Sequence, residues 1–267
     1  MPTRKPIDLN TLRDMYGRGE KIAVLTCYDA LFAGIMDAAG VDVLLVGDSL
    51  GNVLQGRRHT MAVSLDDMVY HTECVARGNG SAWIIADMPF GSYQESAELA
   101  FRHAARLIQA GAHMVKLEGG DWTLPAVRFL VDRGIPVCGH LGLTPQSVHV
   151  LGGYRVQGRD AGAAQTLVRQ GEELAAAGAS LVVLELVPAA VGAEVTRRVP
   201  IPVIGIGAGA ACSGQVLVMH DMLGLTRTTL PRFVRDFMSG SGSIDEAIRK
   251  YVADVKSGAF PDTTHSY

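Results

Sequence analysis

Short apolar runs alternate along the chain with amphipathic segments. Eight of these runs predict strands, and most of the eight are continuous and rich in Val, Ile and Leu, a pattern typical of parallel strands that are covered on both faces. The predicted strands are 22–26, 42–46, 83–86, 113–117, 135–138, 180–184, 202–205 and 216–219.

Helical patterns separate most of these strands, and each pairs with the strand before it as a βα unit. Glycines at 40, 111, 134 and 178 stand just past helix ends, where a left-handed residue commonly ends a helix. The predicted helices are 29–39, 64–77, 95–110, 122–133, 161–177 and 189–198, followed by 230–238 and 243–256.

Eight strands, most of them followed by a helical pattern, predict an α/β protein with a (β/α)8 TIM barrel, which typically needs about 250 residues. The 267 residues fit one such barrel with little left over. We therefore expect a single domain over 1–267, with an N-terminal helical segment and a helical tail at about 230–256.

Composition narrows the range of partners. Hydrophobic residues make up 48% and charged residues 19%, which is enough to fill a sizeable core. The net charge of −3 and the absence of long Lys or Arg runs argue against nucleic acid as a partner. Neither an N-terminal signal segment nor an apolar stretch of about 18 residues is evident, so we expect a cytoplasmic protein without a membrane partner.

Acidic residues follow several of the predicted strands. Asp48, Asp87 and Glu118 come directly after strands two, three and four. The carboxyl ends of barrel strands open on one face, so these side chains could converge on a divalent cation such as Mg²⁺. Any one of them alone could instead cap a helix or form a surface ion pair, but three at equivalent strand ends favour a metal site.

Two further residues point to chemistry at the same face. Lys116 precedes Glu118 by two positions, so both side chains project to one face of a strand, where the amine stays charged and can pair with a substrate carboxylate. Alternatively, Lys116 could form a structural salt bridge inside the barrel. Glu185 ends strand six in apolar company, where loss of solvation strengthens it as a base. Its alternative is an outward ion pair with Arg197 or Arg198.

Weaker signals lie in the loops. His140 ends strand five and could polarise a carbonyl or bind substrate, or it could be a hydrogen-bonded structural residue. The glycine-rich segment 205–215 could cradle phosphate, form a tight turn or leave room for a flat ring. The long segments 47–63 and 139–160 are read as non-helical, and as either a lid or ordered surface loops.

Several of these segments together resemble the ketopantoate hydroxymethyltransferase family, from about Thr26 to His220. The motifs that carry the resemblance are VGDSLGNVLQG, YHTECVARG, IADMPFGSY, VKLEGG, VCGHLGLTPQS, GGYRVQGR, LVVLELVP and IPVIGIGAG. The resemblance implies a (β/α)8 barrel enzyme of pantothenate and coenzyme A biosynthesis. Its reaction would transfer a hydroxymethyl group from 5,10-methylenetetrahydrofolate to 3-methyl-2-oxobutanoate, giving 2-dehydropantoate and tetrahydrofolate through a Mg-stabilised enolate.

The resemblance also assigns roles residue by residue. Asp48 and Asp87 match metal-binding and substrate-contacting acids, and Glu118 matches a third metal residue that can act through water. Ser49 and Lys116 match substrate-contacting positions. Glu185 matches the proton acceptor, and His140 remains a possible additional site residue. The family further implies one Mg²⁺ per subunit and a homo-oligomer, commonly a decamer.

Two competing interpretations remain. One is a Mg-dependent α-keto-acid lyase or mutase of the phosphoenolpyruvate mutase and isocitrate lyase type, whose barrels also bind α-keto acids. The other is a catalytically silent barrel that only binds a ligand or scaffolds a complex. The second interpretation predicts missing acids at the strand ends, and all of them are present.

Overall fold

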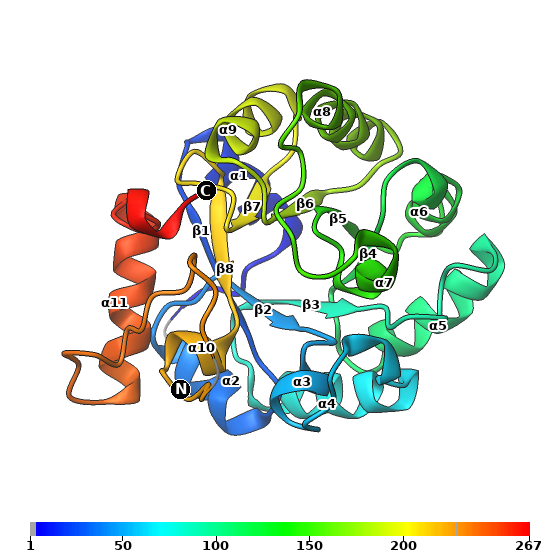
Figure 1. Cartoon of the computed structure of the whole chain (residues 1–267). Helices are drawn as coiled ribbons and strands as arrows, with labels where there is room; N and C mark the ends of the chain where they lie inside the picture. Colours follow the sequence, from blue (N-terminus) through cyan, green and yellow to red (C-terminus); the bar gives the residue numbers. More distant parts are fainter. Residues whose placement is uncertain (1–3, 228) are drawn as a thin grey trace.

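The computed structural model describes residues 4–227 and 229–267, and a closed barrel of parallel strands forms its centre (Figure 1). Each strand pairs with the next along the chain, and β1 pairs with β8 to close the ring. The strands are β1 Ile22–Thr26, β2 Val43–Val46, β3 Trp83–Asp87, β4 Met114–Glu118, β5 Val137–Gly142, β6 Leu181–Glu185, β7 Val203–Ile206 and β8 Gly214–Leu217. The predicted barrel is confirmed.

Helices form the outer ring (Figure 1). The longer ones are α1 Leu9–Gly17, α2 Ala30–Ala38, α4 Leu65–Gly78, α5 Ala97–Gln109, α6 Leu124–Val131, α8 Ala161–Ala176, α9 Ala189–Arg198 and α11 Ile244–Ser257. Short turns are α3 Leu50–Val53, η1 Thr60–Ala62, η2 Asp121–Thr123, η3 Pro145–Ser147, α7 Val148–Leu151, α10 Met219–Met222 and η4 Thr263–His265. The long segments 47–63 and 139–160 therefore contain helical turns, so the expectation that they are non-helical is wrong in part.

The predicted helix over 230–238 is wrong, because this stretch folds as an irregular segment. Tertiary contacts outweigh its helical pattern. Phe233 packs so closely against Gly207 that a Cβ there would meet its ring at 3.0 Å. Further along, the backbone N–H of Phe237 donates to the carbonyl of Met222 at 2.8 Å, and the ring is fully buried. These separate anchors hold the segment against the barrel in place of an i to i−4 ladder.

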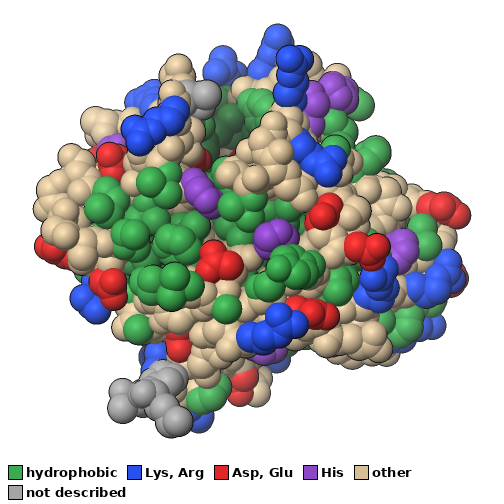
Figure 2. Space-filling view, turned by 90° about the horizontal axis from the view of Figure 1, so that it is seen from below, with side chains coloured by type: hydrophobic (Ala, Val, Ile, Leu, Met, Phe, Trp, Pro, Cys, Tyr) green, Lys and Arg blue, Asp and Glu red, His purple; other side chains and the backbone are tan. Residues whose placement is uncertain are grey.

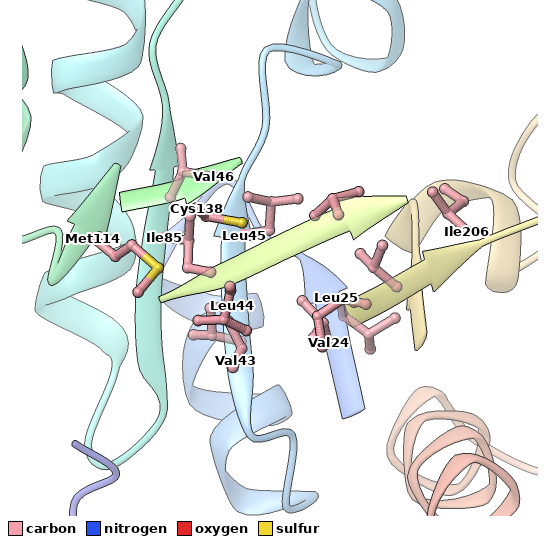
Figure 3. Close-up of a cluster of buried hydrophobic side chains, with 14 of the residues drawn as sticks. Val24, Leu25, Val43, Leu44, Leu45, Val46, Ile85, Met114, Cys138 and Ile206 are labelled. Carbon is pink, nitrogen blue, oxygen red and sulfur yellow. The ribbon is translucent and has the colours of Figure 1, made fainter. Parts of the chain in front are cut away.

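The barrel core is built from aliphatic strand residues (Figure 3). Nearly every residue of the eight strands is buried, because one side faces the interior and the other faces the helix ring. Figure 3 shows Val43 to Val46 of β2 among side chains from neighbouring strands. The continuous apolar runs of the sequence thus reflect burial on both faces.

A buried carboxylate ties both ends of the chain to the barrel floor. Asp42 stands just before β2, is 1% exposed, and accepts the backbone N–H of Ala23 at 2.9 Å. It also pairs with Lys256 of α11 at 2.6 Å and with Arg4 of the N-terminal segment. Two elements outside the barrel are therefore fastened to its N-terminal end, opposite the mouth.

Replacing Asp42 with Ala is expected to lower the free energy of unfolding by about 2–3 kcal/mol, because a buried partner of two cations and one backbone N–H is lost. Urea unfolding followed by circular dichroism measures this change. Glu20→Ala is the matched control, since Glu20 bonds the same Lys256 at 3.0 Å from an exposed position. It should cost less than about 1 kcal/mol, and equal losses in the two variants would contradict the assigned role of Asp42.

Candidate active site

The predicted site residues meet in one cavity of about 460 Å³ at the carboxyl ends of the strands. Strand register explains this convergence. Asp87 on β3 is paired with Lys116 on β4, and Glu118 is paired with His140 on β5. The cavity brings together all seven candidates from the sequence, namely Asp48, Ser49, Asp87, Lys116, Glu118, His140 and Glu185.

Lys116 forms the centre of this group. Its Nζ lies 3.2 Å from Asp87 Oδ1, 3.6 Å from Glu118 Oε1 and 3.0 Å from His140 Nδ1. All four side chains are almost completely buried. Burial by itself lowers the pKa of Lys116, but Asp87, Glu118 and Asp48 more than offset it and raise the pKa above its usual value. The amine is therefore a fixed positive charge.

Asp48 and Asp87 lie side by side at the exits of β2 and β3. The backbone N–H of Asp48 donates to Asp87 Oδ2 at 3.0 Å. Burial, followed by the nearby charges of Asp87 and Glu118, raises the pKa of Asp48 to about 8. Burial likewise raises the pKa of Asp87, although Lys116 opposes it. Buried carboxylates that lie this close together favour the binding of a cation between them.

Glu118, which lies beside His140, has a lowered pKa, in contrast to the raised pKa values of the two aspartates. Burial alone would raise the pKa of Glu118, but Lys116 and His140 lower it below its usual value. Burial and the charge of Lys116 lower the pKa of His140, but Glu118 and Glu185 outweigh them and raise it to about 9. The imidazole is therefore charged at neutral pH, with Nδ1 3.4 Å from Glu118 Oε1 and Nε2 3.2 Å from Glu185 Oε2. The ring thus lies between the lysine cluster and Glu185.

Glu185 points into the cavity from the end of β6. Its side chain is 15% exposed and contacts His140. The alternative of an outward ion pair is wrong, because Arg197 pairs with Glu194 and Arg198 pairs with Glu172. The carboxylate therefore faces the same space as the acids and the lysine.

The backbone around Glu185 is tightly constrained. Leu186 has a φ of 52°, an uncommon conformation for a non-glycine residue, and costs on the order of 1–3 kcal/mol. Hydrogen bonds hold it in place, since its N–H donates to Ile206 O at 2.9 Å and its carbonyl accepts from Gln157 at 2.8 Å. Gly142 lies beside it, where a Cβ would stand 2.1 Å from the Glu185 carbonyl oxygen. Strain of this kind is common at functional sites.

Sequence reasoning missed Gln146, which connects three parts of the site. Its Nε2 donates to Asp48 Oδ2 at 2.9 Å and to Met88 O at 3.0 Å, and its backbone N–H donates to Glu118 Oε2 at 2.9 Å. Its Oε1 accepts from the hydroxyl of Tyr93 at 2.8 Å. Gln146 stands inside the motif VCGHLGLTPQS, but no spacing in the sequence indicates that it reaches Asp48.

Replacing Gln146 with Leu is expected to reduce turnover about 10- to 100-fold, because a side chain that orients Asp48, a candidate Mg²⁺ ligand, is lost. A Mg²⁺ titration by calorimetry should show weaker binding in parallel. Gln94→Ala is the control, since Gln94 bonds Gln146 Oε1 at 3.2 Å without touching Asp48. Unchanged Mg²⁺ binding in Gln146→Leu would contradict this positioning role.

A further tyrosine supports the neighbouring serine. Ser49 Oγ lies 2.9 Å from the hydroxyl of Tyr28, which is buried in the barrel wall. Gly47 leaves open space in front of this pair, since a Cβ at Gly47 would lie 2.7 Å from Ser49 Oγ and 3.7 Å from Asp87 Oδ2. This glycine keeps the floor between Ser49 and Asp87 accessible to a ligand.

The donor set fits Mg²⁺. Among the described residues, no group of three or more His, Cys, Asp or Glu side chains forms a ready-made metal site. Mg²⁺ usually takes only one or two protein carboxylates and fills its other positions with water and substrate oxygens. Asp87 Oδ1 is buried and accepts no hydrogen bond from the residues that the structure describes, although Lys116 Nζ lies 3.2 Å from it, so this oxygen is suited to bind a cation. Asp48 and Asp87 could therefore hold the ion.

Both long segments after strands two and five line the cavity. Asn52 and Thr60 come from the first, and Leu143, Pro145 and Tyr154 from the second. The rings of His59 and His149 contact each other edge to face, with 4.9 Å between their centroids, and so join the two segments.

The glycine-rich segment 205–215, in contrast, packs as a tight turn. Gly207 and Gly209 have φ values of 63° and 87°, which glycine adopts most readily. A Cβ at Gly209 would stand 2.8 Å from the side chain of Ala189 at the start of α9. The structure thus supports the tight-turn interpretation of this segment.

Solved structures share this barrel. A phosphonomutase from Burkholderia cenocepacia, described as putative, aligns with a TM-score of 0.63 at 16% identity, covering 81% of this chain and 95% of that one. Phosphoenolpyruvate phosphomutase from Streptomyces platensis aligns with a TM-score of 0.61 at 17% identity, covering 96% and 91%. Phosphonopyruvate hydrolase, solved with oxalate and Mg²⁺, aligns with a TM-score of 0.62 at 14% identity, covering 94% and 96%. These similarities show the fold.

Sequence comparison is far more specific. The family model described as ketopantoate hydroxymethyltransferase matches residues 6–263. The 3-methyl-2-oxobutanoate hydroxymethyltransferase of Methylobacillus flagellatus is 62% identical over 261 residues, covering 98% of this chain and all of that protein. The enzyme of Methylibium petroleiphilum named 3-methyl-2-oxobutanoate hydroxymethyltransferase 2 is 59% identical over 266 residues, covering 99% and 95%. The chain belongs to the ketopantoate hydroxymethyltransferase family.

Proposed function

We propose that this enzyme transfers a hydroxymethyl group from 5,10-methylenetetrahydrofolate to 3-methyl-2-oxobutanoate, giving 2-dehydropantoate and tetrahydrofolate for pantothenate and coenzyme A biosynthesis. One observation carries the proposal. A permanently charged Lys116, two carboxylates suited to Mg²⁺ and the carboxylate of Glu185 all face one cavity. An α-keto acid requires this combination of an anion-binding group, a metal and a base.

Lys116 and Ser49 bind the carboxylate of the keto acid in this proposal. The ammonium of Lys116 is held by Asp87 and Glu118 and can form a further charge-assisted bond to the substrate carboxylate. The Ser49 hydroxyl, fixed by Tyr28, can donate to the same group. Such contacts would direct C3 of the substrate toward β6 and hold it there during the reaction.

Asp48 and Asp87 bind the metal ion directly in this proposal, and Glu118 binds it through a water molecule. When bound, Mg²⁺ would act as a Lewis acid on the oxygens of the keto acid. Asp48 is oriented for this by Gln146, which occupies its Oδ2. One Mg²⁺ per subunit is expected.

Glu185 takes the C3 proton. Its Oε2 receives the proton and the electron pair of the C–H bond passes to C3 and the carbonyl oxygen, forming an enolate. His140 Nε2 lies 3.2 Å from this carboxylate and can hold its position. The enolate carbon then attacks the methylene carbon of the folate, which has opened to an iminium ion; a C–C bond forms and the C=N electron pair passes to the folate nitrogen. The oxygen of a water molecule next bonds to the methylene carbon as the C–N bond breaks. The nitrogen keeps the electron pair of that bond and takes a proton from the water, so tetrahydrofolate leaves and the hydroxymethyl group remains on C3.

An assay of ketopantoate formation with and without Mg²⁺ tests substrate, reaction and metal together. Product is expected only when the keto acid, methylenetetrahydrofolate and Mg²⁺ are all present. In D₂O without folate, Mg²⁺-dependent deuterium incorporation at C3 should isolate the proton-transfer step. Absence of both product and exchange in the folded enzyme would overturn the proposal.

The lyase or mutase alternative has support from fold alone. The three solved structures reported above are 14–17% identical to this chain, whereas the two hydroxymethyltransferases reported there are 59% and 62% identical. A lyase of that type would not need to enolise a branched acid such as 3-methyl-2-oxobutanoate. Cleavage or rearrangement of a phosphonopyruvate or 2-hydroxy acid, without C3 exchange in the branched acid, would favour this alternative.

We extend the proposal to a cytoplasmic homo-oligomer, with a decamer implied by the family. The described residues include no helix long and apolar enough to cross a membrane. Leu31 of α2 and Tyr70 of α4 are 74% and 62% exposed, and hydrophobic side chains gather on the face shown in Figure 2. Light scattering coupled to gel filtration would measure the number of subunits.

A further inference from the structure

A second cavity, of about 710 Å³, adjoins the cavity that holds the acids. The two share a wall at the barrel mouth, formed by Ser49, Asn52, Tyr154, Val218, Thr229 and Pro231. Ser49 directly follows Asp48, so the shared wall begins beside the proposed metal ligands. A ligand that reaches the acids from this side must pass through the second cavity.

Three arginines line this cavity, and we call it the arginine cavity. Arg57 and Arg58 come from the segment after β2, and Arg227 follows α10. Within residues 4–227 and 229–267, no ion pair holds any of these guanidinium groups, and Arg57 donates instead to Gln55 Oε1 at 2.6 Å. Lys and Arg side chains surround a hollow at the upper edge of the face in Figure 2.

Arginines on the outer helices α8 and α9, in contrast, form ion pairs. Arg169 of α8 pairs with Glu173, and Arg198 of α9 pairs with Glu172. In the arginine cavity, Asp221 contributes a carboxyl group, but it accepts the hydroxyl of Thr226 at 2.6 Å and burial raises its pKa. The cavity therefore has an excess of positive charge that suits an anion.

The shape of the co-substrate indicates which anion this is. The one-carbon unit of methylenetetrahydrofolate must reach C3 of the keto acid beside Glu185. The glutamate tail, with its carboxylates, lies at the opposite end of the molecule and must extend toward the mouth. Guanidinium groups bind carboxylates through paired, charge-assisted hydrogen bonds.

We propose that the arginine cavity binds the glutamate carboxylates of the folate co-substrate through Arg57, Arg58 and Arg227. This inference rests on the proposed function. Elongated polyglutamate tails, with one more carboxylate per residue, would gain further from the same positive charge.

A third cavity, which also contains Tyr154, is an alternative site for the glutamate carboxylates. A smaller cavity of about 460 Å³ contains Arg155 and Arg159 and shares only Tyr154, Leu186 and Tyr267 with the acid cavity. It has two arginines instead of three and does not touch Ser49. It supplies a matched control, because its arginines also lie near the mouth.

The test compares KM for methylenetetrahydrofolate with KM for methylenetetrahydropteroate, which lacks the glutamate. The first variant is Arg57→Ala combined with Arg58→Ala, the second is Arg227→Ala, and the control combines Arg155→Ala with Arg159→Ala. Circular dichroism and Mg²⁺-dependent C3 exchange, which needs no folate, show that each variant is folded and keeps its proton-transfer step.

We expect KM for the glutamate-bearing folate to rise about tenfold in each of the first two variants, since a charge-assisted hydrogen bond is worth about one decade of affinity. KM for the pteroate, KM for the keto acid and the exchange rate should stay unchanged. In the wild-type enzyme, KM for the folate should also rise with salt. Triglutamate should bind more tightly than monoglutamate in the wild type only.

Three outcomes would overturn the inference. These are an unchanged KM in both variants, an equal rise for folate and pteroate, or a rise confined to the Arg155 and Arg159 control. Each of these leaves the proposed function standing, because product still forms. If the wild-type enzyme uses neither folate nor pteroate, the proposed function itself fails, and the inference fails with it.

Discussion

Glu185→Gln is expected to lower kcat by about 10³-fold, because general-base catalysis typically contributes 10²- to 10⁴-fold. The amide keeps the shape of the side chain and its place beside His140 but cannot accept the C3 proton. Substrate binding through Lys116 and Ser49 should be preserved, so KM for the keto acid should change little. Steady-state turnover and C3 deuterium exchange measure the two effects.

The exchange measurement makes this prediction specific. A residue that only shaped the cavity would slow product formation without abolishing proton transfer, whereas the base controls both. Glu172→Gln is the matched control, because it makes the same substitution in a glutamate that pairs with Arg198 on the outer surface. Exchange at the wild-type rate in Glu185→Gln would assign the base to another group.

If Asp87 binds the metal as proposed, Asp87→Asn should weaken Mg²⁺ binding by about 100-fold or more and lower turnover at fixed Mg²⁺ accordingly, because the carboxylate loses its charge. The asparagine oxygen can still accept the backbone N–H of Asp48, which Asp87 Oδ2 accepts at 3.0 Å, so the local backbone should be kept. Lys116 loses one of its carboxylate partners, and its affinity for the substrate carboxylate should not fall.

Calorimetric titration with Mg²⁺, and turnover measured across Mg²⁺ concentrations, test this prediction independently of each other. Asp121→Asn provides the control, since Asp121 follows β4 in sequence but pairs with Arg169 on the surface. Near-normal turnover of Asp87→Asn at low Mg²⁺ would remove Asp87 from the metal site. Loss of turnover with intact Mg²⁺ binding would instead give it a role toward substrate alone.

The sequence predicted much of the fold because each element carries its own signal. Apolar runs that are buried on both faces identified the eight strands, and glycines with positive φ such as Gly40 and Gly111 marked the helix ends. The predicted helix over 230–238 failed because the same apolar residues serve another purpose. Phe233 and Phe237 anchor separately to the barrel, and no local pattern distinguishes this from one face of a helix.

The site could be predicted in outline for a related reason. A parallel barrel directs every strand exit to one mouth, so acids at 48, 87, 118 and 185 had to share a face once the strands were identified. The roles of these residues remain proposals, as do those of Lys116 and Ser49. The partners of Glu185 were beyond prediction, because His140 reaches it from a different strand.

The sequence by itself determined the barrel, the order of its strands and the presence of carboxylates at their ends, since periodicity and strand direction are local properties. Only the tertiary structure decided which atoms meet. Gln146 contacts Asp48 across 98 positions, the register places Glu118 beside His140, and Leu186 takes a positive φ. Contacts of this kind depend on strand register and loop packing, which arise when distant segments compete for the same space, and no single segment encodes the result.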